Sequence, residues 1–150
     1  MKFIAYCIAT FAGIGYFPFA SGTAATAAGI GAAYLVVANQ GLYFGLLGLM
    51  FAVGVIACGY VEKDLGKADP GIAVIDEVVG VWIALWGLPL TAPVMICGFF
   101  LFRAFDMFKI YPINRLEALP GGWGIMLDDV MAGLYTQLTL QLALRWAGVI

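Results

Sequence analysis

The sequence contains no histidine and few charged residues, since 11% of its 150 residues are Asp, Glu, Lys or Arg. Without histidine, every mechanism that needs an imidazole as base, nucleophile or metal ligand is excluded. Acid–base chemistry would therefore depend on carboxylates, lysine or water bound to a metal ion. The net charge of −2 provides no basic surface of the kind that binds nucleic acid, so we expect no nucleic-acid partner.

The scarcity of charge accompanies an excess of apolar residues. Hydrophobic residues make up 64% of the chain, and its charged fraction is well below the roughly 25% of an ordinary soluble domain. We therefore expect an integral membrane protein, and the length predicts one domain over residues 1–150. The N-terminal apolar run has a single lysine and is followed by Gly, Pro and aromatic residues, so we interpret it as retained rather than as a cleaved signal peptide.

The three cysteines, Cys7, Cys58 and Cys97, all lie in apolar stretches and are interpreted as small buried hydrophobic residues. Cys97 and Arg103 match the C-x5-R spacing of cysteine-dependent phosphatases. That chemistry needs a loop of exposed N–H groups and a thiol of lowered pKa. Because the intervening residues form an apolar helical run, we do not expect a thiol mechanism.

Apolar runs separated by polar breaks predict an all-α membrane protein of about four to six helices. Residues 24–38 form one run, a break follows at 39–41, and residues 42–61 form a run long enough to span a bilayer alone. A polar loop is expected from Glu62 to Pro70, and the last helix is expected from about Asp128 to Trp146. Residues 3–12 are too short to span and are expected in the membrane interface.

The apolar run over residues 78–102 is interrupted by Gly87, Pro89 and Pro93. These residues favour a hairpin of two short helices over one straight span. The hairpin would place the motif loops, and all basic residues except Arg145, on one membrane face. By the positive-inside rule that face is cytoplasmic. The basic residues on it would be Lys2, Lys63, Lys67, Arg103, Lys109 and Arg115.

Carboxylates in the polar breaks are the first functional candidates, because an ionisable side chain is costly to place in a bilayer. Two adjacent pairs, Asp76-Glu77 and Asp128-Asp129, each lead directly into an apolar run. Paired hard oxygen donors indicate a divalent cation, and a cation beside Lys and Arg indicates a phosphate. We expect these seven to gather on the cytoplasmic face: Asp64, Asp69, Asp76, Glu77, Asp106, Asp128 and Asp129.

Three further patterns allow a functional and a structural interpretation. The glycine-rich segment 13–23 offers close backbone approach and a helix N-terminus to an anion, or it is an interfacial loop capped by Thr23. Arg103, Asp106 and Lys109 recur at i+3 steps, which suits either a phosphate-binding face or a ladder of ion pairs. Glycines at 121–124 precede Asp128-Asp129, and two acids at a helix start exceed what capping needs.

Taken together, the motifs resemble the phosphatidylglycerophosphatase A family from Gly13 to Gly133. The matching patterns are Gly13-x-Gly15-x-x-Pro18-x-x-x-Gly22-Thr23, Asp76-Glu77-x-x-Gly80-x-Trp82, Phe102-Arg103-x-Phe105-Asp106-x-x-Lys109-x-x-Pro112-Ile113 and Gly121-Gly122-x-Gly124-Ile125-Met126-x-Asp128-Asp129-x-x-Ala132-Gly133. The chain departs from the family pattern at Ser21, Ala25, Ile110 and Glu117. The first three change loop stiffness, whereas Glu117 replaces an Asp with a longer carboxylate and is left out of the predicted site.

The resemblance implies a multi-pass enzyme of the bacterial inner membrane with its active site facing the cytoplasm. It would be a magnesium-dependent lipid phosphatase of phospholipid biosynthesis that hydrolyses phosphatidylglycerophosphate to phosphatidylglycerol and inorganic phosphate. Asp76, Glu77, Asp128 and Asp129 would hold Mg²⁺, and Asp106 would be a further ligand or a base. The expected catalytic residues are Asp76, Asp106 and Asp128, and the expected substrate-binding residues are Gly22, Thr23, Arg103 and Lys109. Attack by water and attack by a carboxylate are both compatible with this set.

Other functions compatible with acids in a membrane protein are less well matched. A magnesium-dependent phosphotransferase acting on a lipid headgroup would carry spaced aspartates with Gly and Ala-Arg between them, and this signature is not in the sequence. A small cation transporter would place acids at mid-membrane depth on several helices, whereas these acids cluster at helix ends. A purely structural membrane subunit would leave the paired acids without a purpose.

Overall fold

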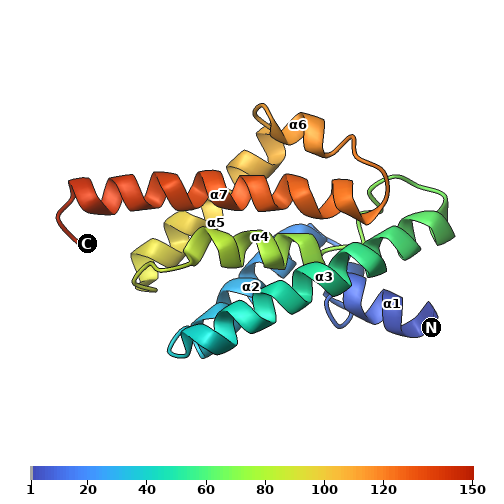
Figure 1. The fold of residues 1–150 in the computed structure, drawn as a ribbon, viewed down its shortest axis with the longest axis horizontal. Coiled ribbons are helices and arrows are strands. Elements are labelled where there is room, and N and C mark those ends of the chain that lie inside the picture. Colours follow the sequence, from blue (N-terminus) through green and yellow to red (C-terminus); the bar gives the residue numbers. More distant parts are fainter. Residues whose placement is uncertain (1) are drawn as a thin grey trace.

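A computed structural model describes residues 2–150, and within this range the chain is all-helical, with seven α-helices, one short 3-10 helix and no strand (Figure 1). The N-terminus and the C-terminus lie at opposite ends of the long axis. The elements in chain order are α1 (Lys2–Ala9), η1 (Ile14–Tyr16), α2 (Ser21–Val36), α3 (Gln40–Leu65), α4 (Ile75–Leu85), α5 (Ala92–Phe108), α6 (Ile113–Leu116) and α7 (Gly122–Trp146).

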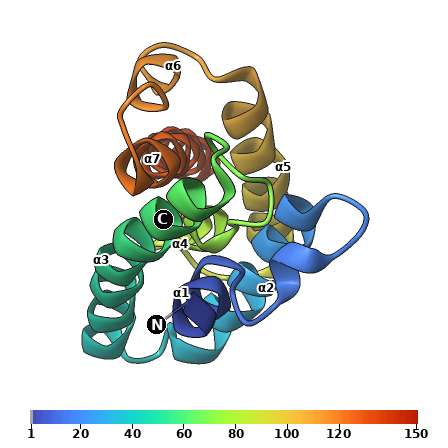
Figure 2. The ribbon, with the colours of Figure 1, turned by 90° about the vertical axis from the view of Figure 1, so that its right-hand side faces the viewer.

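Helix α4 is the centre of the fold, with α2, α3, α5 and α7 packed around it (Figure 2). Every α4 residue is buried except Glu77 and Ile83, which are half-buried. This explains why α4 reads as an almost continuous apolar run after its first turn, because a helix that is apolar all round is one that is enclosed by other helices.

The closest helix crossing is between α4 and α7, which run side by side in the same direction (Figure 1). A Cβ atom added to Gly133 would collide with the carbonyl oxygen of Gly80. A Cβ atom added to Gly80 would lie 2.7 Å from the carbonyl oxygen of Asp129 and 2.6 Å from the Phe102 ring. Small residues at such a crossing let two helix backbones approach closely.

An aromatic pair joins α4 to α2 and α3. The Trp82 and Tyr43 rings stack with their centroids 4.8 Å apart. The Trp82 indole N–H donates to the Gly29 carbonyl oxygen at 2.8 Å, and the Tyr43 hydroxyl donates to the Trp82 carbonyl oxygen at 2.6 Å. Both polar atoms of this buried pair are therefore satisfied, which removes the desolvation penalty that unpaired groups would carry.

The predicted hairpin is confirmed. Helix α4 ends at Leu85, α5 begins at Ala92, and Gly87 between them has a φ of +67°. Glu77 at the start of α4 and Arg103 near the end of α5 form an ion pair, so both ends of the hairpin lie on one side. The predicted break before α3 is also confirmed, because the Asn39 side chain accepts a hydrogen bond from the Leu42 N–H at 3.0 Å.

Two predicted boundaries are wrong. The polar loop begins after Leu65 rather than at Glu62, because nothing breaks the helix until Gly66 adopts a left-handed φ of +62°. Helix α7 begins at Gly122 rather than near Asp128. The glycines before the acid pair look like a flexible loop in sequence, but Gly122 is a packing residue, since a Cβ atom there would collide with the Val55 carbonyl of α3.

Side-chain exposure corrects one further expectation. Cys58 is buried as predicted, but Cys7 and Cys97 are exposed, because their helices turn these positions outward. Helix α1 has eight residues and is about 12 Å long, which agrees with the expectation that it is too short to span. By length and apolar composition, α3 is the one helix within residues 2–150 that qualifies to cross a membrane.

The α4–α7 crossing predicts a strong asymmetry among glycine substitutions. Gly133→Ala should destabilise the fold by about 1–3 kcal/mol, because the added methyl group overpacks a backbone contact. Gly48→Ala in α3 is the matched control, since a Cβ atom there meets nothing within 4 Å, and its effect should stay within about 1 kcal/mol. Thermal unfolding of both variants in detergent measures the difference, and equal midpoints would contradict the role given to Gly133.

Candidate active site

A polar cavity of about 370 Å³ lies where the first turns of α2 and α4 and the second turn of α7 meet the end of α5 and the loop before α4. It gathers most of the charged residues that the sequence singles out. The charged side chains that line it are Asp69, Asp76, Glu77, Asp106, Asp128, Asp129, Arg103 and Lys109. The chain is otherwise poor in charge, so this concentration marks the cavity as the functional centre.

The acid pair of α4 is placed at the helix start, as predicted, where the helix dipole favours negative charge. Asp76 is 7% exposed, and its Oδ1 atom has no hydrogen-bond partner. The Oε2 atom of Glu77 is also buried and without a partner. Burying carboxylate oxygens without a partner is costly, so the two atoms point to a cation or donor that belongs to the site.

Arg103 joins α4 to α5 through two carboxylates. Its Nη1 atom donates to Asp106 Oδ2 at 2.7 Å and to Glu77 Oε1 at 3.3 Å. Gly22 makes room for this pair, since a Cβ atom on it would collide with Glu77 Oε1 and lie 3.1 Å from Arg103 Nη1. The predicted site residue Gly22 therefore lines the cavity, whereas its neighbour Thr23 is exposed and does not line it.

Lys109 joins the end of α5 to α6 and α7. The Lys109 ammonium donates to Asp128 Oδ2 at 3.1 Å and forms an ion pair with Glu117 Oε1 at 2.7 Å. Burial alone would lower the pKa of Lys109, but the interactions with Glu117 and Asp128 raise it above the ordinary value. The side chain is therefore a permanent positive charge at the cavity wall.

The acid pair of α7 lies in the second turn of the helix rather than at its start. Asp128 Oδ1 accepts a hydrogen bond from the Asp129 N–H at 3.0 Å, and Asp129 is 2% exposed. Both line the cavity although neighbouring helix residues point about 100° apart. Asp128 faces Lys109, and Asp129 lies at the α4–α7 crossing.

Two further charged residues were given no role from the sequence. Asp69 lines the cavity, as its place among the seven candidate carboxylates suggested, although the sequence Asp69-Pro70-Gly71 by itself indicates only a turn. Burial raises the pKa of Asp69, and the nearby Lys109 charge opposes that shift. Glu117 was set aside for its length, yet that length brings its carboxylate to Lys109. The acidic chemistry of both was visible in the sequence, but their distance from the motifs hid the contact.

Six of the seven carboxylates expected on one membrane face line the cavity. Asp64 does not line it, and it binds Lys2 Nζ at 2.8 Å and the Tyr6 hydroxyl at 2.7 Å. This pairing fixes α1 against the end of α3. Cys97 does not line the cavity either, in agreement with the rejection of a thiol mechanism.

The donor set fits a hard divalent cation. Carboxylate oxygens are the ligands that Mg²⁺ prefers, and Mg²⁺ is commonly held by one or two carboxylates together with water and substrate phosphate rather than by a complete protein cage. Within residues 2–150 no three acidic side chains converge into a preassembled metal centre. The unpartnered oxygens of Asp76 and Glu77 therefore match an ion whose remaining ligands come from water or substrate.

The fold and the cavity define an all-helical phosphatase whose site contains carboxylates, a guanidinium and an ammonium group and no histidine. The family follows from the sequence match: the family model described as Phosphatidylglycerophosphatase A covers residues 7–144, and the chain belongs to this family. No solved structure matches the chain.

The curated relatives carry two different names. A protein of Bacteroides thetaiotaomicron, provisionally named phosphatidylinositol-3-phosphatase, is 37% identical over 97% of this chain and 96% of its own length. Phosphatidylglycerophosphatase A of Escherichia coli is 36% identical over 81% of this chain and 73% of its own length. Phosphatidylglycerophosphatase A of Haemophilus influenzae is 39% identical over 65% of this chain and 61% of its own length.

The two carboxylates bound by one guanidinium make Arg103→Lys a sharp test of the site. Lysine keeps the charge but replaces the planar guanidinium, whose Nη1 contacts both acids, with a compact ammonium, so phosphatase activity should fall by about tenfold or more. Arg115→Lys is the matched control, because Arg115 lies outside the cavity, 5.2 Å from the Tyr111 ring centroid. Phosphate release by the two variants gives the comparison, and equal activity would contradict the placement of Arg103.

Proposed function

We propose that this chain is a single-domain, multi-pass enzyme of the bacterial inner membrane that depends on magnesium. It hydrolyses phosphatidylglycerophosphate to phosphatidylglycerol and inorganic phosphate in phospholipid biosynthesis, and its site faces the cytoplasm. The observation that carries the proposal is the polar cavity, where buried carboxylate oxygens without partners lie beside Arg103 and Lys109.

A membrane environment is supported by the outer surface of the helices. Large apolar side chains point outward along several of them, and soluble monomers rarely expose such extensive apolar surface. Leu35 is 81% exposed, Ile56 74% and Leu142 69%, on α2, α3 and α7. Helix α3 has the length and composition to span. We propose that further helices also cross the membrane. In this arrangement Arg145 lies at the end opposite the cavity, and the remaining basic residues lie on the cytoplasmic side.

The substrate phosphate would bind to the two fixed cations of the cavity. Arg103 and Lys109 already donate to carboxylates, so a phosphate with more negative charge would compete for the same donors. Gly22 lets the Glu77–Arg103 pair lie directly against the N-terminal turn of α2. Free N–H groups at that turn would add to phosphate binding. Thr23 is exposed and does not line the cavity, so its part in the proposal is limited to continuing this helical turn.

Asp76, Glu77, Asp128 and Asp129 would hold the Mg²⁺. When bound, Mg²⁺ supplies a Lewis acid that polarises the phosphoryl group and offsets its charge. Asp106 orients Arg103 and is the candidate base. Water attacks the phosphorus, the bond from phosphorus to the glycerol oxygen breaks, the water proton passes to a carboxylate and the glycerol oxygen gains a proton. In the alternative mechanism, Asp76 or Asp128 attacks the phosphorus, and water then hydrolyses the phosphorylated carboxylate.

Phosphatidylinositol 3-phosphate is the second candidate substrate. The relative from Bacteroides thetaiotaomicron, which matches 97% of this chain, is provisionally named as a phosphatase of that lipid. Both lipids present a phosphomonoester at the membrane surface, so the cavity chemistry suits each. Phosphate release from the two lipids, measured side by side in detergent micelles, decides between them. A higher kcat/KM for phosphatidylglycerophosphate is expected, and the reverse order would replace the proposed substrate.

Asp76→Asn and Asp128→Asn should each lower phosphate release by about a hundredfold or more, because each removes a charged oxygen donor from the site. Asp64→Asn is the matched control, since Asp64 lies outside the cavity. EDTA should abolish wild-type activity and added Mg²⁺ should restore it. Mg²⁺ should also raise the unfolding midpoint of the wild-type protein more than that of Asp76→Asn. Normal turnover by both site variants, or EDTA-resistant turnover, would sink the proposal.

A further inference from the structure

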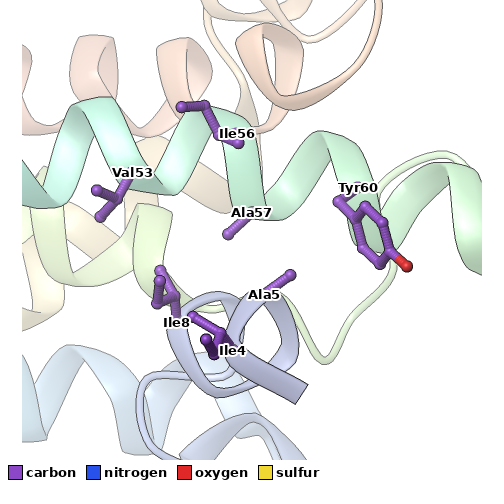
Figure 3. A pocket seen from close by; sticks show the side chains of 7 residues that line it. All are labelled: Ile4, Ala5, Ile8, Val53, Ile56, Ala57 and Tyr60. Carbon is purple, nitrogen blue, oxygen red and sulfur yellow. The ribbon is translucent and has the colours of Figure 1, made fainter. Parts of the chain in front are cut away.

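Two apolar grooves mark the outer surface of the bundle. The first, about 300 Å³, lies between α1 and α3 and is lined by Ile4, Ala5, Ile8, Ile56 and Tyr60 among others (Figure 3). The second, about 370 Å³, lies between α2 and α5 and is lined by Ala27 and Ile30 from one helix and by Met95, Ile96, Phe99 and Phe100 from the other. Their relation to the polar cavity distinguishes them.

The α2–α5 groove lies one to two helical turns from the cavity along the same two helices. Gly22 of α2 and Arg103 of α5 line the cavity. Ala27 is five residues beyond Gly22, about 7 Å along the helix axis. Phe99 is four residues before Arg103, about 6 Å along its axis. Neither α1 nor α3 contributes a residue to the cavity, so the groove in Figure 3 shares no helix with it.

We propose that the α2–α5 groove binds an acyl chain of the glycerophospholipid whose phosphomonoester occupies the polar cavity. This inference rests on the proposed lipid-phosphatase function and adds to it the place where the hydrophobic part of the substrate lies. The pair of helices that lines both the groove and the cavity supplies the geometry, because a lipid with its phosphate beside Arg103 would extend an apolar chain along α2 and α5 into the groove.

The chemistry of the groove suits a flexible hydrocarbon chain. The α2 wall is low, since Ala27 is small, and the α5 wall is high, with the Phe99 and Phe100 rings in edge contact at a centroid distance of 5.3 Å. Ile96 is 57% exposed and Phe100 66%, which leaves apolar surface for a chain to cover. Burial of each methylene group against such surface is favourable.

The groove also has a defined far end. Ala92, the first residue of α5, lines it and is eleven residues before Arg103, about 16 Å along the helix axis. A chain that reaches Ala92 fills the groove, and a shorter chain leaves the far end empty. The groove should therefore discriminate substrates by acyl length, and its two ends should respond differently to substitution.

The test compares dihexanoyl, dioctanoyl and dipalmitoyl phosphatidylglycerophosphate in mixed micelles. Ala27→Trp fills the near end of the groove, so the ratio of kcat/KM for the dipalmitoyl substrate to that for the dihexanoyl substrate should fall by about tenfold or more. Ala5→Trp is the matched control, because it fills the other apolar groove, and its ratio should equal that of the wild type.

Ala92→Trp is the second variant and keeps the inference testable if Ala27→Trp does not fold. It fills the far end of the groove, so it should reduce activity on the dipalmitoyl substrate and spare the dioctanoyl substrate. The inference would be overturned if the kcat/KM ratios between long and short substrates stayed unchanged in both variants. It would also be overturned if the ratio fell equally in Ala5→Trp, because the two grooves would then be equivalent sites for bulk lipid. A change of oligomeric state in Ala27→Trp, measured by light scattering, would instead assign the groove to a second copy of the chain.

The wild-type protein separates the two proposals. If it releases phosphate from phosphatidylglycerophosphate and the ratios do not change in the groove variants, the acyl site alone is wrong. If it releases no phosphate from this lipid at any chain length, the proposed function is wrong and the acyl site is overturned with it.

Discussion

The close crossing of α4 and α7 is the constraint on which the site depends. Gly80 and Gly133 allow the two backbones to touch. Asp76 lies one turn before Gly80, and Asp129 lies one turn before Gly133. The helices run in the same direction (Figure 1), and both acids line the cavity at the same end of the crossing. A larger residue at either glycine would separate the helices and, with them, the carboxylates that a divalent cation would have to bridge.

The two cations of the cavity pair with some of its carboxylates and leave others unpaired. Arg103 ties Glu77 of α4 to α5, and Lys109 ties Asp128 to Glu117. Arg103 and Lys109 line the cavity, while one carboxylate oxygen each on Asp76 and Glu77 has no hydrogen-bond partner. A site that is fully neutralised within itself has little affinity for added ions, whereas this one retains unmet acceptors beside fixed donors. That combination suits simultaneous binding of a cation and a phosphate.

The apolar exterior and the polar cavity meet at the ends of α2 and α5, which is where an amphipathic substrate needs both. Helices of a membrane enzyme must satisfy their own backbone groups, so ionisable residues are tolerated only where they face the interior or a water-filled cavity. Here they lie near the starts of α2, α4 and α7 and the end of α5. The same two helices that present Gly22 and Arg103 also line the α2–α5 groove, so in the proposed function one pair of helices would bind both the headgroup and an acyl chain.

The sequence by itself determined the helical class, the break between residues 85 and 92 and the identity of most charged site residues. These are local properties: proline and glycine punctuate helices, and charge is conspicuous in an apolar chain. Only the tertiary structure decided that α7 begins at Gly122, that Glu117 pairs with Lys109 of the site, and that Asp64 and Thr23 lie outside the cavity. Gly122, which looks like part of a loop in the sequence, proved to be a packing contact with α3. Such contacts depend on which distant backbone approaches, and no local pattern encodes that distance.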